Sequence, residues 1–222
     1  MLKLVIFFLF FIIIFIILVL GFFWDDLKKI SEKKNHKKHV YKVLHDFVEE
    51  KDQLLLNDTN FFFEDDVSKL YKVDHILICD KYVYIIKDYT NFGGIYGNLE
   101  DPQLFIQTPN NTKGTIDNPV LENLSVTSKI EKMTKIDHDQ HLYVSVVVYN
   151  DSLVVPKGVA IKSQNSWFLP LSELVETINI AEEDQIDPLK KESSQRLAEQ
   201  IKTKSDATKK FVKDSKVKNK NK

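Results

Sequence analysis

The feature that most limits how this chain can fold is an unbroken apolar stretch near its N-terminus. From Leu4 to Trp24, 21 consecutive residues carry no charge, and most of them are Leu, Ile, Phe or Val. A helix of this length can cross a hydrocarbon core of roughly 30 Å. The alternative is a cleavable signal peptide, whose apolar region would be about 7–15 residues long and would end in small residues. This stretch is longer and ends in aromatic residues, so we predict a transmembrane anchor over residues 1–24, with Leu4, Phe15 and Trp24 among its membrane-contacting residues.

The lysines around this stretch predict its orientation. Only Lys3 precedes it, whereas seven lysines follow it closely: Lys28, Lys29, Lys33, Lys34, Lys37, Lys38 and Lys42. Because positive flanks stay on the cytoplasmic side, we expect a single-pass protein of the cell membrane whose globular domain lies in the cytoplasm. Cys79 is the only cysteine, which excludes an internal disulfide and agrees with a reducing compartment.

The charges divide the remaining chain into an acidic body and a basic tail. Residues 35–180 hold 14 lysines and 21 acidic residues, whereas residues 201–222 hold nine lysines and two aspartates. An acidic body binds nucleic acid poorly, because lysine and arginine supply most of the affinity for phosphates. The tail has three open roles: contact with anionic lipid, contact with nucleic acid, or simple solubilisation.

Hydrophobic spacing predicts a mixed α/β fold, a central mixed sheet flanked by helices, after the anchor. A basic juxtamembrane segment and first helix occupy residues 25–50, the α/β domain residues 51–180, and a lysine-rich, mostly disordered tail residues 181–222. A polar stretch over residues 98–117 is predicted to be a long loop. Strands are expected over residues 54–58, 60–64, 73–79, 82–88, around 95–96, 141–150, 158–163 and 166–169, and helices over 27–50, 118–133 and 171–180.

Two neighbouring strands carry the candidate site. Side chains alternate along a strand, so Asp74 shares a face with Ile76 and Ile78, and Lys87 shares a face with Ile85 and Tyr89. A charge on an apolar strand face needs a partner when it is buried. Spacing alone also allows the simpler interpretation that Asp74 is an exposed residue at the end of a strand or part of a local ion pair.

The order of four motifs along the chain is more informative than the spacing within any one of them. The chain has "VDHILI", then the strand "VYIIKDY", then "NFGGIYG", and later "NPVLEN". This set, from about His36 to Ile180, resembles the nuclease-related domain (NERD) family of the restriction-endonuclease-like superfamily. The resemblance implies a restriction-endonuclease-like fold and, in active members, carboxylates that converge on Mg²⁺ together with a lysine near the attacking water.

The family's site residues are mostly replaced in this chain. Asp74 falls on the family aspartate, but Lys87 falls where the family has glutamate and Tyr89 where it has lysine. Lys37 lies where the early helix normally carries an acid, and Glu122 falls on the family glutamine. An ammonium at the position of a metal-binding carboxylate changes the local charge by two units, so we expect a degenerate site in which Lys87 pairs with Asp74, with Glu122 closing the network.

These observations favour an inactive nuclease fold that serves as an interaction or scaffold module and needs no cofactor. Its expected partners are the bilayer, an unknown protein, and nucleic acid or anionic lipid through the basic tail. The alternative is a nuclease for DNA or RNA that uses Asp74 and Glu122 with Mg²⁺ or Mn²⁺. A simple membrane or nucleic-acid tether is a third possibility.

The histidines and glycines are weaker candidates. His75 points away from Asp74 and is expected to pack or to form a hydrogen bond. His36 and His39 are expected at the surface, and the "DHDQHL" stretch, residues 137–142, is expected to be a solvated turn rather than a metal site. The glycines at 93–94 lack the pattern of a phosphate-binding loop.

Overall fold

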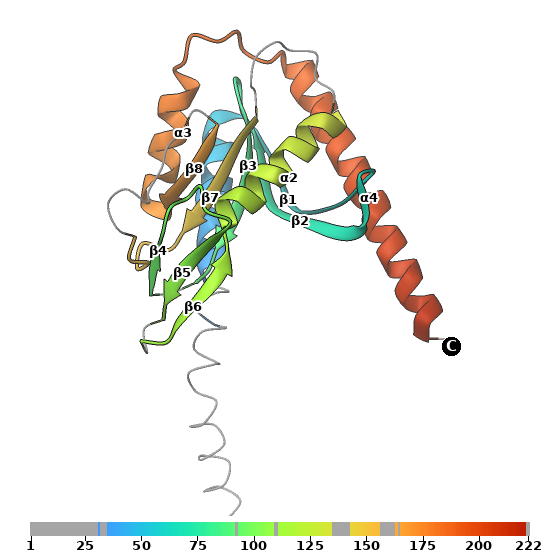
Figure 1. Cartoon of the computed structure of the whole chain (residues 1–222). Helices are drawn as coiled ribbons and strands as arrows, with labels where there is room; N and C mark the ends of the chain where they lie inside the picture. Colours follow the sequence, from blue (N-terminus) through green and yellow to red (C-terminus); the bar gives the residue numbers. More distant parts are fainter. Residues whose placement is uncertain are drawn as a thin grey trace, which may run out of the picture.

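The structure is a computed structural model that describes residues 31, 35–91, 93–108, 111–134, 143–155, 163 and 165–220. It begins with a helix over residues 35–51 and continues as a mixed α/β fold (Figure 1). The predicted fold class, a central mixed sheet flanked by helices, is confirmed for these residues.

The central sheet has five strands in the order β1-β2-β3-β7-β8. The first three strands are antiparallel, and β7 and β8 add in parallel to β3. Their bounds are β1 (Leu54–Phe63), β2 (Asp66–Ile78), β3 (Val83–Tyr89), β7 (Tyr143–Tyr149) and β8 (Ser166–Pro170). All seven residues of β7 are buried, as expected for a parallel strand covered on both faces.

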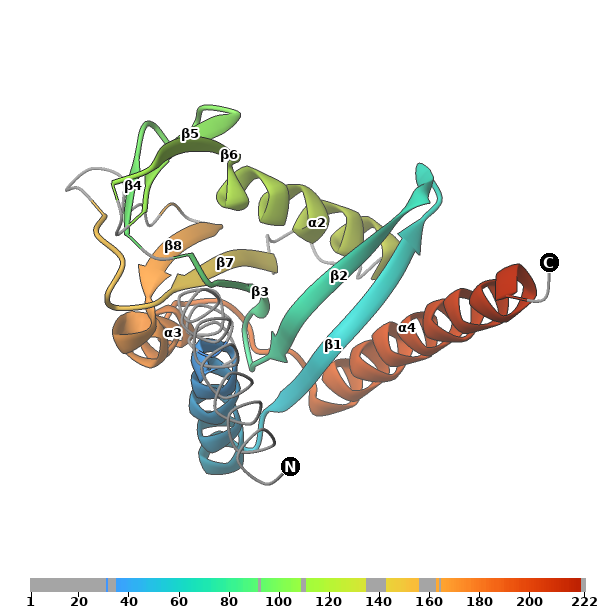
Figure 2. The same ribbon diagram turned by 90° about the horizontal axis from the view of Figure 1, so that it is seen from below.

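Helices cover both faces of this sheet (Figure 2). The helix over residues 35–51 and α3 (Leu174–Glu182), which follows the short helix η1 (Leu171–Glu173), pack on one face through Val40, Leu44 and Ile178. On the other face, α2 (Pro119–Thr134) and α4 (Lys191–Lys220) contribute the apolar side chains of Val126, Ile130, Leu197 and Ile201.

A second, three-stranded antiparallel sheet extends from one end of the domain (Figure 1). Its strands are β4 (Gly94–Tyr96), β5 (Gln103–Gln107) and β6 (Lys113–Asp117). Ile95 and Leu104 on its inner face pack with Val147 and Phe168 of the central sheet. The region expected to be a long loop is therefore mostly a β-hairpin, because Leu104, Ile106 and Ile116 alternate with polar residues and bury one face.

The C-terminal tail also differs from its prediction. Residues 191–220 form α4, which lies along the edge strand β1 (Figure 2). Leu197 and Ile201 are buried, and the Asn60 N–H donates to Ser205 Oγ at 3.0 Å. A few apolar residues along a lysine-rich segment thus pack this helix against β1. Without the helix, β1 would be an open edge of the sheet.

Near the N-terminus, two predicted short strands are one strand, β1, because the register with β2 is the same on both sides of Asp58. β2 begins seven residues earlier than predicted and forms a long hairpin with β1. The helix start at Asn118 is confirmed, since Asn118 Oδ1 accepts the N–H of Val120 at 3.0 Å.

The predicted anchor, residues 1–24, and the "DHDQHL" stretch lie outside the described residues. Within the described part of the chain, no helix is long and apolar enough to span a bilayer.

Candidate functional site

The candidate site is an open pocket of about 420 Å³ at one end of strands β2 and β3. Three elements meet there: the helix over residues 35–51, the β2–β3 pair and the first turn of α2. Its lining includes all five residues that the sequence had singled out: Lys37, Asp74, Lys87, Tyr89 and Glu122.

Strand pairing places the key residues on the predicted faces. The register pairs His75 with Ile86 and Ile76 with Ile85, so Asp74 and Lys87 project from one face and His75 and Asp88 from the other. The ladder ends at His75, and the N–H of Asp88 donates instead to Asp74 Oδ2 at 3.0 Å. The Asp74 carboxylate therefore lies where the two strands separate.

The ion pairs differ from the predicted one. Lys37 Nζ lies 2.5 Å from Asp74 Oδ1, and Lys87 bonds to Glu122. The expected pairing of Lys87 with Asp74 is wrong, because the first helix brings a nearer ammonium to Asp74 and the first turn of α2 brings Glu122 to Lys87. The expected contact between Lys87 and Glu122 is present.

Electrostatics at Lys37 favour its charged form. Partial burial opposes the charge, but the hydrogen bond from Lys37 to Asp74 and the attraction of Asp74, Asp88 and Asp58 outweigh it and raise the pKa of Lys37 above its usual value. Asp74 thus has both carboxylate oxygens occupied, one by an ammonium and one by a backbone N–H.

Tyr89 faces the apolar side of the pocket. Its side chain is 6% exposed, packs edge-to-face on Phe168, and accepts a hydrogen bond from Asn91 Nδ2 at 3.0 Å. Burial raises the pKa of the Tyr89 hydroxyl, partly offset by the Asn91 hydrogen bond. A neutral, buried phenol cannot supply the positive charge that the family lysine would provide.

A divalent metal requires several free oxygen ligands, and the residues present do not fit it. Asp74 and Glu122 each bond to a lysine, and Lys87 occupies the position where the resemblance implies a carboxylate. Among the described residues, no group of three or more His, Cys, Asp or Glu side chains could hold a metal ion.

Three buried polar residues lie on the elements that line the pocket: His36, His75 and Asp88. His75 Nδ1 lies 2.6 Å from Asn57 Oδ1, and His75 Nε2 lies 3.2 Å from Asp88 Oδ2, so His75 forms hydrogen bonds as predicted. His36 was expected at the surface, but it is 2% exposed and its Nε2 lies 3.4 Å from the Val148 carbonyl oxygen. It faces the sheet because it is one turn before Val40, on the same face of the helix.

Sequence reasoning missed Asn123, which fastens α2 to the sheet beneath the pocket. Its Nδ2 donates to the Ile85 carbonyl at 2.8 Å, to Ser145 Oγ at 2.9 Å and to the Val146 carbonyl at 3.2 Å. The available signal was an asparagine on the apolar face of a helix, in line with Val120 and Thr127.

The described residues form a mixed α/β domain with two lysine–carboxylate pairs in one pocket. The family model of the nuclease-related domain (NERD) matches residues 27–150, more than half of the chain. The chain belongs to the NERD family. No curated protein sequence and no solved structure matched it.

Proposed function

We propose that this is a membrane-anchored, cytoplasmic NERD protein that has lost phosphodiester cleavage and acts as an interaction or scaffold module. The observation that carries the proposal is the pair of lysine–carboxylate contacts, Lys37 with Asp74 and Lys87 with Glu122. Two ammonium groups stand in the pocket where metal-dependent cleavage needs one or two cations, and each neutralises a carboxylate.

The anchor rests on the apolar stretch from Leu4 to Trp24 and on the lysines that follow it. The lysines of α4 add a second basic region that suits anionic headgroups. The bilayer and a protein partner are therefore the proposed contacts.

A metal-dependent nuclease is the second candidate function. It is favoured by one observation: Asp74 and Glu122 line the same pocket. In this case, substrate and Mg²⁺ or Mn²⁺ would have to displace both lysines from the carboxylates.

Cleavage by the full chain distinguishes the two functions. The protein should be recovered from the membrane fraction after an alkaline wash, solubilised in detergent, and incubated with plasmid DNA and RNA in Mg²⁺ or Mn²⁺. We expect no more cleavage than with an identically prepared Asp74→Asn variant. Cleavage by the natural chain that disappears in Asp74→Asn would refute the loss of activity, and recovery in the soluble fraction would refute the anchor.

Restoring carboxylates should restore a response to metal. In the double variant Lys37→Glu and Lys87→Glu, the new carboxylates would repel Asp74 and Glu122, so we expect a lower melting temperature without metal. A site with a dissociation constant near 0.1 mM would regain about 2.7 kcal/mol in 10 mM Mn²⁺.

The measurement is thermal unfolding with and without Mn²⁺, and the natural chain should show no comparable shift. A matched control is Lys209→Glu with Lys210→Glu, which changes the same charge on the exposed surface of α4. An equal metal response in this control would contradict a site at the pocket.

A further inference from the structure

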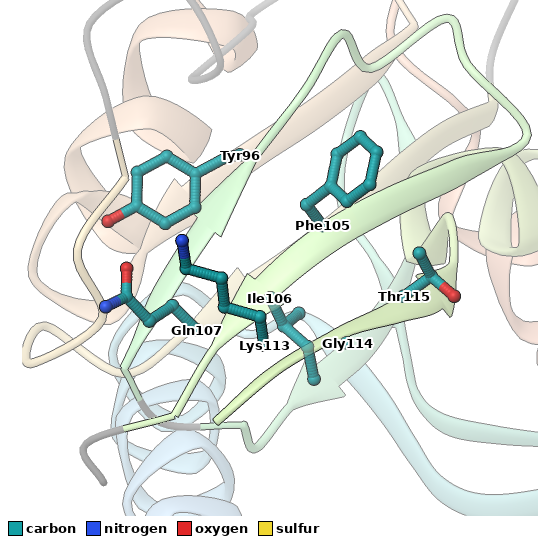
Figure 3. A pocket seen from close by; sticks show the side chains of 7 residues that line it. All are labelled: Tyr96, Phe105, Ile106, Gln107, Lys113, Gly114 and Thr115. Carbon is teal, nitrogen blue, oxygen red and sulfur yellow. The ribbon is translucent and has the colours of Figure 1, made fainter. Parts of the chain in front are cut away.

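The outermost strand of the small sheet, β6, has a free edge. β6 pairs with β5 on one side, and no described strand pairs with its other side. Four of its five residues are exposed, including Gly114, whose exposure is that of the backbone. Beside it lies a shallow hollow of about 730 Å³, with Tyr96, Phe105 and Thr115 among its lining residues (Figure 3).

Two hydrogen bonds at the ends of the β5–β6 pairing show which β6 residues direct their N–H and C=O groups towards β5 and which direct them to the free edge. The Thr108 N–H donates to the Thr112 carbonyl at 2.9 Å, and the Asn118 N–H donates to the Pro102 carbonyl at 3.0 Å. Opposed residues in an antiparallel pair alternate between bonded and non-bonded. The even-numbered residues of β6 therefore bond to β5, and Lys113, Thr115 and Asp117 direct their N–H and C=O groups to the free edge.

The sequence of this edge is complementary to itself. β6 reads Lys-Gly-Thr-Ile-Asp. When two such strands run antiparallel with Thr115 opposite its copy, Lys113 of each chain lies opposite Asp117 of the other. The three outward-facing residues then each donate and accept one backbone hydrogen bond, so the register that satisfies the backbone also forms two ion pairs. A shift of two residues would break both pairs.

We propose that β6 is the contact between two copies of this chain, which join their small sheets into one six-stranded antiparallel sheet about a two-fold axis at Thr115. The exposed faces of the two sheets remain on the same side, because Lys113, Thr115 and Asp117 share one face in each copy. Tyr96, Phe105 and Thr115 of both copies then form one row across that face, with the two Thr115 side chains at its centre.

This contact does not depend on whether the pocket cleaves phosphodiesters. A single strand pair buries less area than a standard interface, so the contact is expected to be weak in dilute solution. Anchoring in a bilayer would raise the effective concentration of the two copies.

Reversing the charge at either end of β6 tests the proposed register. Lys113→Asp places two aspartates opposite each other at both ends of the contact, and Asp117→Lys places two lysines there. Each variant should associate with itself at least about tenfold more weakly than the natural chain. A mixture of the two variants restores opposite charges at both ends and should associate like the natural chain.

The measurement is energy transfer between two fluorescently labelled preparations of the full chain in lipid vesicles, where both copies share one bilayer and the contact is not diluted. Lys209→Asp, on exposed α4, is the control for a change of charge alone. Thr115→Pro should abolish association without unfolding, because the Thr115 N–H faces the free edge and not β5. Association of either single variant as strong as that of the natural chain, a mixture that gains nothing, or a natural chain that stays monomeric would overturn the proposal.

A disulfide provides a second readout. Cys79 is buried, so Thr115→Cys adds the one exposed thiol among the described residues. Mild oxidation should link two copies at Thr115→Cys, whereas Gln103→Cys, exposed on β5 but displaced from the axis, should stay monomeric. Equal cross-linking at both positions would also refute this register.

Discussion

Replacing Asn123 by alanine is expected to destabilise the domain by about 2–4 kcal/mol. Asn123 is 4% exposed and donates to three acceptors on β3 and β7. The alanine side chain donates nothing, so buried acceptors lose a partner and a small cavity forms beneath α2. For a domain of this size the melting temperature should fall by about 4–16 °C, measured by the tryptophan fluorescence of the full chain, in which Trp167 is buried.

Ser125→Ala is the matched control, because Ser125 is exposed on the same helix. Its melting temperature should change by no more than about 2 °C, since surface substitutions stay within about 0.5 kcal/mol. An Asn123→Ala protein as stable as this control would show that α2 is held by apolar packing and that the hydrogen bonds contribute little.

The second large effect is expected at Gly93. Its φ of +104° lies in a region that L-amino acids with a side chain rarely adopt, and an added Cβ would lie 2.0 Å from the Gln107 carbonyl oxygen. Both backbone segments belong to the small sheet and cannot separate without breaking the β4–β5 pairing. Gly93→Ala should therefore destabilise the protein by about 3–5 kcal/mol, the sum of backbone strain and overpacking.

Gly114→Ala provides the comparison within the same sheet. An added Cβ at Gly114 would meet only Ile106 Cγ1, at 3.9 Å, so we expect little loss of stability. Thermal unfolding of the two variants separates these outcomes. Similar melting temperatures would show that β4 can shift away from β5, and that the small sheet is less rigid than its packing implies.

The local patterns predicted most of the elements near the site. Strand alternation placed Asp74 on a face with Ile76, and Lys87 on a face with Ile85. The register of β2 with β3 then joins these into one face of the sheet. The asparagine and proline at 118–119 predicted the start of α2. These predictions succeeded because each depends on residues close together in the chain.

Two of the predictions that failed depend on residues far apart in the chain. Lys37 and Asp74 are 37 positions apart in the sequence. The residues near Asp74 in the chain therefore could not predict that Lys37 would be its partner. In the same way, Leu197 and Ile201 are two apolar residues in a lysine-rich segment of the sequence. Their packing partners on β1 are far away in the chain and could not be predicted from that segment. The hairpin of β5 and β6 was missed because its polar tip suggested a loop.

The sequence by itself determined the family, the order of most elements and the faces of the strands. The tertiary structure decided which lysine neutralises which carboxylate, where α4 docks and which backbone groups of β6 remain free. The physical reason is range: side-chain alternation and capping act within a few residues, whereas ion pairs, helix docking and strand edges depend on how elements far apart in the chain are brought together.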